Sequence, residues 1–227
     1  MKNQIKITIA LALFFLAALT DIYAVITENQ VIELYSKPML LTLLAVVYLV
    51  STKKPMFWYV FGMFCCWVGD VLLLFEGADF FTYGLASFLL GHVIYIKLTV
   101  GFLPKDLTVK MITSAVPFLL LFGVLMSLIH SNLGGMLVPV AIYGITISTF
   151  GSIALLNYRT NNSVENLWLF LGALIFIVSD GLIALNKFHE PHQIYGVTIM
   201  LTYILAQFLI CKSMIVKSAS ISNNSEK

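Results

Sequence analysis

Charged residues are scarce in this chain of 227 residues: Asp, Glu, Lys and Arg make up 11%, and hydrophobic residues 60%. Soluble domains have about 25% charged and about 45–50% apolar residues. A water-soluble fold of this size could not bury so much apolar surface. The composition therefore excludes an ordinary soluble domain and indicates a protein that lies in the lipid bilayer.

The sequence also lacks a basic patch and a metal-binding pattern of cysteines. Its formal net charge is only +2, and the basic residues do not cluster with aromatic ones, so we expect no nucleic-acid partner. The cysteines Cys65, Cys66 and Cys211 lie inside apolar runs without the spacing of metal ligands. They are predicted to be small core residues, and we expect no metal and no other cofactor.

Long apolar runs, in contrast, fill most of the chain. A transmembrane helix needs roughly 20 mostly apolar residues, and short polar connectors separate eight runs of about this length. The runs are Ile5–Ile26, Tyr35–Val50, Phe57–Phe75, Phe80–Leu103, Met111–Ile129, Leu133–Leu156, Leu167–Leu185 and Ile194–Val216. We predict an all-α integral membrane bundle of eight helices, with one transmembrane domain over residues 1–217. The Ser- and Asn-rich segment 218–227 is predicted to be a disordered tail.

The basic residues predict the orientation of this bundle. Ile5–Ile26 is too long for a signal peptide and no clean cleavage site follows it, so it is predicted to be an uncleaved first helix. With eight crossings, both termini share one side with the loops after the second, fourth and sixth helices. Eleven of the 13 basic residues fall on that side, which the positive-inside rule places in the cytoplasm. Only Lys37 and Lys187 fall on the other side.

Two parts of the sequence resemble each other at a constant offset. Gly62 and Asp70 match Gly172 and Asp180, since 172 − 62 and 180 − 70 both equal 110. The matched helices are separated by four crossings, so they run in the same direction through the membrane. This predicts a parallel 4+4 internal repeat about an axis near the membrane normal, unless the likeness reflects only the shared composition of apolar helices.

Three aspartates are predicted to lie at one level of the membrane. Asp21, Asp70 and Asp180 each precede the non-cytoplasmic end of a run by about five residues, or roughly 7–8 Å at 1.5 Å per residue. Because a carboxylate is costly in hydrocarbon, such residues normally face the bundle interior or a wet cavity. They indicate either a functional site or hydrogen bonds between helices.

Other polar residues could complete a site at this level. Lys187 follows Asp180 by two helical turns, so its ammonium could reach back toward that carboxylate. Lys37 precedes Pro38, which suits the first turn of a helix, and either lysine could bind an anionic head group or extend to the interface. His92 could be a proton relay, a metal ligand or a hydrogen-bonded core residue, the last being the commonest role.

The last run carries a polar stripe that could line a cavity or bond to neighbouring helices. It consists of Tyr195, Thr198 and Thr202. The His189–His192 loop resembles a metal site only loosely, because Pro191 breaks the helical spacing. We therefore predict no metal there.

Several of these stretches together resemble the YhhN-like lysoplasmalogenase family, in an order and spacing that cover residues 37–207. The stretches are Lys37-Pro38, Gly69–Leu73, Gly91–Tyr95 and Ser179–Phe188. The resemblance implies hydrolysis of the vinyl-ether bond of a lysoplasmalogen, an alkenyl-glycerophosphocholine or -ethanolamine, to a fatty aldehyde and a head group. By motif, Asp70 and Asp180 become the catalytic pair. The substrate-binding candidates are Lys37, Lys187, Asp21, His92 and Tyr195.

A pair of carboxyl groups suits this reaction. Protonation of the β-carbon of a vinyl ether gives an oxocarbenium ion that water captures, and glycosidases handle a related ion with two carboxylates. Two carboxyl groups in a low-dielectric site can share one proton, and the sequence does not decide which is the acid. The expected partners are a lysophospholipid substrate and membrane lipids, in the inner membrane of a bacterium or the endoplasmic reticulum of a eukaryote. The oligomeric state stays open.

Two other functions remain open at the level of sequence. Parallel repeats with ionisable residues at their interface also suit a small-solute or proton-coupled transporter, although the acidic level lies off-centre. A metal-dependent lipid hydrolase would use His92 together with the aspartates. Solute flux without aldehyde release would favour the first, and inhibition by chelators the second.

Overall fold

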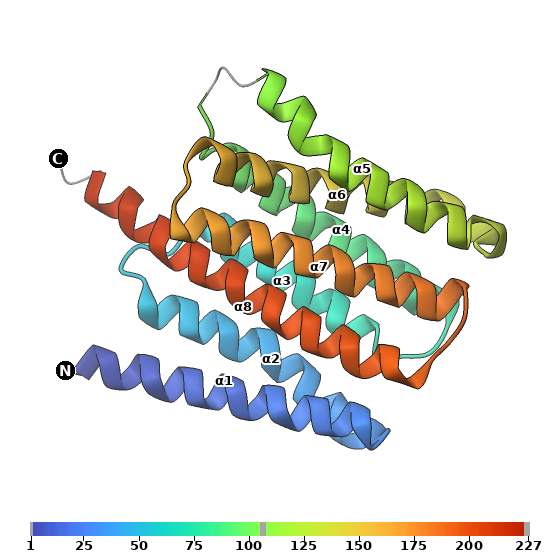
Figure 1. Cartoon of the computed structure of the whole chain (residues 1–227). Helices are drawn as coiled ribbons and strands as arrows, with labels where there is room; N and C mark the ends of the chain where they lie inside the picture. The colour runs from blue at the N-terminus through green and yellow to red at the C-terminus, as the bar shows by residue number, and fades with distance from the viewer. Residues whose placement is uncertain (1, 105–107, 225–227) are drawn as a thin grey trace.

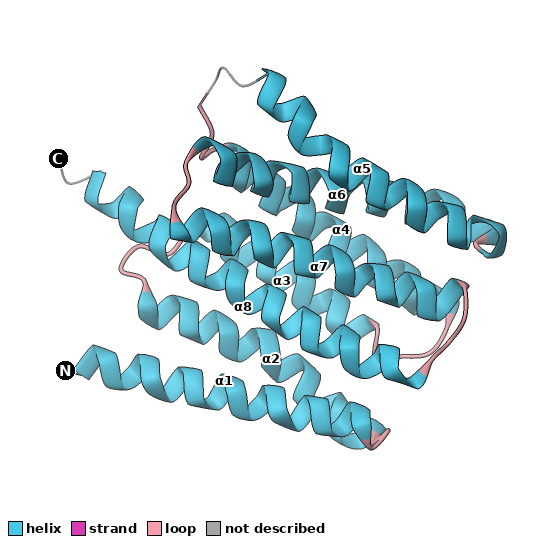
Figure 2. Cartoon of the chain, viewed as in Figure 1, coloured by secondary structure: helices cyan, strands magenta, loops and turns pink. Residues whose placement is uncertain are grey.

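The computed structural model describes residues 2–104 and 108–224, and every long regular element in these ranges is an α-helix (Figures 1 and 2). The helices are α1 (Lys2–Ile26), α2 (Gln30–Ser51), α3 (Phe57–Leu72), α4 (Ala78–Val100), α5 (Thr108–Ile129), α6 (Leu137–Thr160), α7 (Val164–Phe188) and α8 (Gln193–Asn224). Two short 3₁₀ turns, His130–Asn132 and Gly134–Met136, join α5 to α6. The predicted eight-helix, all-α fold is therefore confirmed.

Seven of these helices are long and apolar enough to cross a membrane, and the shorter apolar α3 has 16 residues. Many large apolar side chains point away from the bundle, such as Leu19, 66% exposed, and Val124, 60% exposed. Apolar side chains on the outside of a helix bundle need lipid rather than water around them. The chain is a multi-pass membrane protein.

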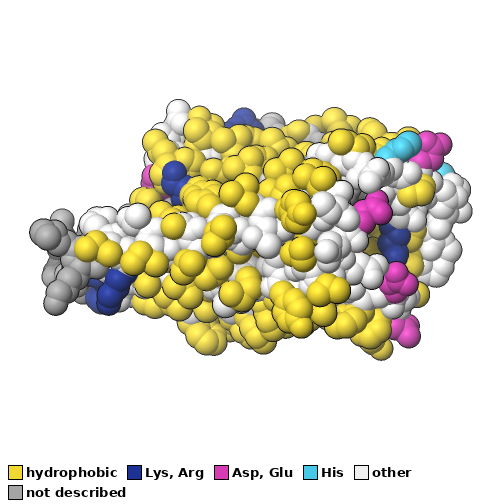
Figure 3. All heavy atoms as spheres, turned by 90° about the horizontal axis from the view of Figure 1, so that it is seen from below, with side chains coloured by type: hydrophobic (Ala, Val, Ile, Leu, Met, Phe, Trp, Pro, Cys, Tyr) yellow, Lys and Arg dark blue, Asp and Glu magenta, His cyan; other side chains and the backbone are white. Residues whose placement is uncertain are grey.

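The pairs α1–α2, α3–α4, α5–α6 and α7–α8 pack as antiparallel hairpins, and the hairpins meet where α2 packs against α3 and α8 and where α6 packs against α4 and α7. Both ends of the chain lie at the same end of the bundle, while α1 and α5 lie at its opposite edges (Figure 1). Figure 3 shows acidic and histidine side chains gathered at one end of a largely apolar surface, with basic side chains toward the other end and also among the acidic ones. We call these the acidic end and the basic end; the loops after α1, α3 and α7 lie at the acidic end.

Two glycines allow close contact inside the hairpins. A Cβ atom on Gly62 would lie 2.5 Å from the ring of Tyr95 on α4, and one on Gly172 would lie 2.8 Å from Cγ1 of Ile210 on α8. Real Cβ atoms do not approach other atoms so closely. The residues that match in sequence therefore occupy the tight crossings of α3 with α4 and of α7 with α8.

The start of α2 differs from the expectation. The helix begins at Gln30, where the side chain of Asn29 accepts a hydrogen bond from the backbone N–H of Ile32 at 3.1 Å, as N-cap residues do. Lys37 and Pro38 therefore lie two turns inside α2 instead of at its start. The indole N–H of Trp67 donates to the carbonyl oxygen of Pro38 at 2.9 Å.

The chain beyond residue 217 also differs from the expected disordered tail, because α8 continues to Asn224. Serine and asparagine are weak helix formers, but Ser218 is buried and its hydroxyl lies 2.6 Å from that of Tyr48. This contact ties the extended end of α8 to α2. Residues 225–227 lie outside the described ranges.

Candidate functional site

Asp70 is buried near the acidic end of α3, with 3% of its surface exposed. The hydroxyl of Tyr203 on α8 donates a hydrogen bond to Asp70 Oδ2 at 2.5 Å. The amide of Gln207, one turn further along α8, donates to the Tyr203 hydroxyl at 3.3 Å. Asp70 thus faces the bundle interior, where its carboxyl is held by a polar chain from another helix.

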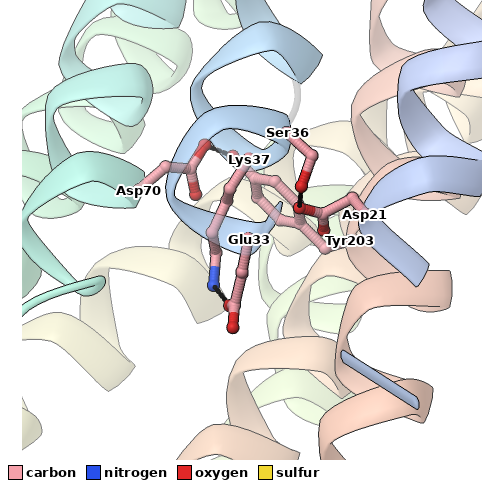
Figure 4. A network of polar contacts seen from close by, with 6 residues as sticks. All are labelled: Asp21, Glu33, Ser36, Lys37, Asp70 and Tyr203. Carbon is pink, nitrogen blue, oxygen red and sulfur yellow. Dashed lines mark hydrogen bonds and ion pairs between the residues drawn. The ribbon is translucent and has the colours of Figure 1, made fainter. Parts of the chain in front are cut away.

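Four further polar residues lie near Asp70 (Figure 4). On α2, the ammonium of Lys37 pairs with Glu33 at 3.0 Å, and the hydroxyl of Ser36 donates to Asp21 Oδ1 of α1 at 2.6 Å. Lys37 is close enough to interact electrostatically with both Asp21 and Asp70. Residues from α1, α2, α3 and α8 therefore form one cluster around Asp70.

Asp180 lies on α7 and is half-buried. The hydroxyl of Tyr143 on α6 donates a hydrogen bond to Asp180 Oδ2. Asp180 also lies within electrostatic range of Asp70. The two aspartates that match in sequence therefore both point into the bundle, where tyrosines of different helices hold them.

A polar cavity of about 690 Å³ opens at the acidic end of the bundle, and we call it the vestibule. Its walls include Lys37 of α2 and Lys187 of α7, together with Glu28, Glu33 and Asn186. The structure therefore brings together the two lysines that fall outside the basic end. An acidic side chain, Glu33, pairs with Lys37.

An apolar groove of about 290 Å³ lies between α5, α6 and α7. It is lined almost entirely by aliphatic and aromatic side chains, and Asp180, Tyr143 and Ser148 are its ionisable or hydroxyl-bearing residues. Leu121 and Val178, both on its wall, are 43% and 44% exposed. The groove is therefore open on its side to the lipid around the bundle.

A smaller pocket of about 50 Å³ lies between the vestibule and the groove, and we call it the connecting pocket. It shares Leu73, Phe81 and Ile183 with the vestibule and shares Asp180 and Tyr143 with the groove. Asp180 therefore lies where a polar compartment with two lysines meets an apolar one.

Lys187 differs from the expectation. Its ammonium lies 4.3 Å from the ring centre of Phe81 in a cation–π contact, instead of reaching back to Asp180. An aromatic face attracts a cation near the membrane surface, and this contact leaves Lys187 on the vestibule wall.

His92 and Tyr195 do not line these cavities. His92 is fully buried, its Nδ1 lies 2.9 Å from the carbonyl oxygen of Phe88, and its ring packs 4.7 Å from that of Phe176. Tyr195 packs against His192, with ring centres 5.2 Å apart. Neither is among the residues that line the vestibule, the connecting pocket or the groove.

The predicted stripe on α8 bonds to its own helix. The hydroxyl of Thr198 donates to the carbonyl of Ile194 at 2.9 Å, and that of Thr202 to the carbonyl of Thr198 at 2.7 Å. Over the described residues, no three His, Cys, Asp or Glu side chains are grouped so that they could hold a metal ion.

The sequence analysis missed Tyr143 and Tyr203, which provide the hydrogen bonds to the two aspartates. Each lies within an apolar run, where a tyrosine hydroxyl usually needs a partner. A tyrosine within an apolar run was thus the signal that could have pointed to them. The chain has eight other tyrosines, however, and several of these also lie in or near apolar runs. Sequence alone gives no means of choosing between them.

Comparison with known proteins gives a family but no solved structure. The YhhN family model matches residues 32–214. Human lysoplasmalogenase TMEM86A is 32% identical over 153 residues, which cover 65% of this chain and 61% of the relative. Human lysoplasmalogenase TMEM86B is 31% identical over 67% of this chain and 61% of the relative. The chain thus matches less than two thirds of the length of these relatives, and no solved structure matches.

Proposed function

The chain belongs to the YhhN family, and from this premise we propose that it is a lysoplasmalogenase. Its reaction would cleave the vinyl-ether bond of a lyso-alkenyl phospholipid to give a fatty aldehyde and a glycerophospho-head group. The observation that carries the proposal is the position of Asp180 between the lysine-bearing vestibule and the apolar groove. A single-chain lipid is polar at one end and apolar at the other, and the vestibule and the groove on either side of Asp180 differ in the same way.

The cavities suggest how the substrate binds. The phosphate would lie in the vestibule near Lys37 and Lys187, and the alkenyl chain would follow the groove between α5, α6 and α7. The vinyl-ether bond joins these two parts of the lipid, so it would lie in the connecting pocket beside Asp180. Tyr195 and His92 would act through packing, whereas Asp21 would act through the cluster around Asp70.

The surroundings of the two carboxyl groups suggest their roles. A neutral carboxyl is less costly to bury against apolar side chains than a carboxylate, and Asp180 faces the apolar groove. Asp180 is therefore assigned as the acid that protonates the β-carbon. Asp70, with Lys37 nearby, is assigned as the carboxylate that stabilises the oxocarbenium ion and accepts a proton from water. Glycosidases divide these tasks between two carboxyl groups in the same way.

The atoms balance in this scheme without a co-reactant. The proton of Asp180 forms the new C–H bond, and water adds its oxygen to the oxocarbenium carbon while its proton passes to Asp70. Collapse of the hemiacetal then breaks the bond between that carbon and the glycerol oxygen. In the collapse, protonated Asp70 gives its proton to the leaving glycerol oxygen and the Asp180 carboxylate takes the proton of the hemiacetal hydroxyl, so both aspartates return to their starting protonation states.

We further propose that the bundle is a parallel 4+4 repeat within one domain, with both termini in the cytoplasm. The packing of α8 on α2 and of α4 on α6, and the tight crossings at Gly62 and Gly172, support the repeat. The basic residues near the ends of the chain support the orientation. The vestibule would then open toward the non-cytoplasmic leaflet.

Asparagine variants of the two aspartates test the function. Asp70→Asn and Asp180→Asn should each lower aldehyde release from a lyso-alkenyl phospholipid in liposomes by about 10²–10⁴-fold, the usual contribution of an acid or base. Asp79→Asn, an exposed change in the first turn of α4, serves as the control. A lyso-acyl phospholipid should give no aldehyde with any of them.

The outcome against the proposal is equally definite. If both variants are expressed normally and turn over the alkenyl lipid at near-wild-type rates, the aspartates do not carry the chemistry. If the wild-type protein moves solutes across liposomes and releases no aldehyde, the protein is a transporter instead.

A further inference from the structure

A column of polar side chains extends from Asp70 toward the basic end, where α3, α4 and α8 meet. We call it the polar column, and its members are Tyr203, Gln207 and Cys211 of α8, Cys66 and Tyr59 of α3, and Tyr95 of α4. The α8 members are spaced by four residues and so share one helix face. From Tyr203 to Cys211 the column is about 12 Å long at 1.5 Å per residue.

Contacts between neighbouring side chains make the column continuous. Gln207 donates to the hydroxyl of Tyr203 at 3.3 Å, and both Gln207 and Tyr95 lie beside the thiol of Cys66. The rings of Tyr95 and Tyr59 stack with centres 5.7 Å apart. The column thus passes from α8 across α3 to the α4 side of the core.

The basic end of the column reaches a loop. The ring of Tyr59 contacts that of Tyr48, with centres 4.7 Å apart. The hydroxyl of Tyr48 accepts a hydrogen bond from the backbone N–H of Met56 at 2.9 Å and lies 2.6 Å from the hydroxyl of Ser218. Met56 immediately precedes α3, in the connector that carries Lys53 and Lys54. Polar groups therefore connect this loop with Asp70.

Several polar atoms in the column are buried without a hydrogen bond to a nitrogen or oxygen atom of the described residues. The hydroxyls of Tyr59 and Tyr95 lie beside the thiols of Cys211 and Cys66, which are weak hydrogen-bonding groups, and the Oε1 atom of Gln207 has no hydrogen-bond partner among these residues. These three residues are 0%, 0% and 1% exposed. Buried polar atoms are almost always bonded to protein or to ordered water. Phenylalanine and leucine would fill the same space without this cost, so three such atoms in one column indicate sites for water.

Water at these sites could serve the proposed reaction. Each turnover consumes one water molecule, which must reach Asp70. A bound lipid would fill the vestibule with its head group and the groove with its alkenyl chain, so both openings of the path would be occupied. The polar column approaches Asp70 from the opposite direction, through Tyr203.

We propose that the polar column binds a chain of water molecules that leads from the loop before α3 to Asp70 and supplies the water for hydrolysis. The hydration of the column stands on the geometry alone, whereas the use of its water rests on the proposed function. Gln207 is the central positioning residue, since it lies between Tyr203 and Cys66.

Hydroxyl-radical footprinting with X-rays tests the hydration without any assay of activity. Radicals formed from bound water modify side chains beside it, even in a protein interior. After correction for the intrinsic reactivity of the two ring types, Tyr59 and Tyr95 of the full-length protein in nanodiscs should be modified several-fold faster than Phe14, which is 1% exposed and packs against Phe208 outside the column. Equal, slow modification of the three rings would overturn the proposal.

Gln207→Leu tests the supply of water, with Ile210→Leu as the control. Ile210 is equally buried on α8 but faces Gly172. Gln207→Leu should lower kcat by about tenfold, leave KM unchanged and slow the modification of Tyr95, whereas Ile210→Leu should change none of these. Tyr95→Phe, which removes one oxygen, should lower kcat in the same direction if Gln207→Leu does not fold.

The outcomes separate this inference from the proposed function. A wild-type protein that releases aldehyde normally while Tyr59 and Tyr95 stay unmodified would refute the water column alone. A protein whose column is modified but which releases no aldehyde would refute the lysoplasmalogenase function and the use of the water, and would leave the hydration standing. Normal kcat in Gln207→Leu would exclude the column as the supply route.

Discussion

The two matched aspartates lie in different surroundings. Asp70 is 3% exposed and is surrounded by polar groups, with the hydroxyl of Tyr203 at 2.5 Å and Lys37 within electrostatic range. Asp180 is half-buried and lines an apolar groove, where its polar neighbours are Tyr143 and Asp70. The same residue at matched positions therefore faces a polar cluster in one half of the chain and a lipid-like cavity in the other.

The two halves of the chain are therefore similar in their helices but differ in the residues that surround the two aspartates. In the proposed repeat α8 corresponds to α4, so a symmetric site would hold Asp180 with a tyrosine of α4. The tyrosine comes from α6 instead. A duplicated helix pair can supply two carboxyl groups at one depth, and the residues around them can then make one an acid and the other a base. The following predictions test this division of roles.

Removal of the tyrosine hydroxyl groups should give the largest difference in kcat between the two aspartate sites. Hydrogen bonds to a charged group contribute about 1.5–3 kcal/mol, and those between neutral groups about 0.5–1.5 kcal/mol. Tyr203→Phe, which removes the donor to the proposed carboxylate of Asp70, should lower kcat by about ten- to a hundredfold. Tyr143→Phe, beside the proposed acid, should cost about tenfold or less. Measured kcat values in which Tyr143→Phe is the worse variant would reverse the two roles.

A larger side chain in the groove should weaken binding of the alkenyl chain beside Asp180 and leave the cluster around Asp70 unchanged. A Cβ atom on Gly181 would meet only Leu125, at 3.9 Å, so Gly181→Leu can enter the groove without breaking the bundle. Displacing two methylene groups of the alkenyl chain, at about 0.8 kcal/mol each, should lower kcat/KM for a long-chain substrate by about tenfold. A short-chain substrate should lose much less.

Gly123→Leu on α5 is the matched control, because a Cβ atom there meets nothing within 4 Å. It should leave kcat/KM unchanged for both chain lengths. An equal loss for long and short chains in Gly181→Leu would show that the groove does not hold the tail.

Removal of a vestibule charge should have the smallest effect. Lys187 is exposed and lies over Phe81, and an exposed ion pair contributes about 0.2–1 kcal/mol. Lys187→Gln should raise KM by about fivefold or less, with kcat unchanged, and high salt should remove the difference. Lys97→Gln, at the basic end over Trp58, should leave KM as it is. Equal KM values for the two variants at low salt would exclude the phosphate contact.

The sequence predicts the helices well because length and apolar composition are local properties. The same holds for the aspartates, since a carboxyl group in an apolar run must be turned inward. Contacts between helices depend on rotation and depth, which no run reveals. For that reason Tyr143 and Tyr203 were missed, and Lys187 was expected at Asp180 although a nearby ring holds it.

Capping and tertiary contacts explain the other differences. Asn29 caps α2 earlier in the chain than the apolar run suggests. Lys37 was therefore expected at the start of the helix, but it lies two turns inside it. The bond of Ser218 with Tyr48 supports helix where composition favours disorder. In both places one polar side chain outweighs the propensity of a whole segment.

The lateral opening of the groove has a consequence for the fate of the products. The head group would diffuse from the vestibule into water, while the aldehyde, held between α5 and α7, would pass sideways into the membrane. Cleavage would thus sort its two fragments into different phases, and neither would have to pass the other on the way out. Accumulation of long-chain aldehyde in the bilayer, and not in solution, would then set how strongly the product inhibits the proposed reaction.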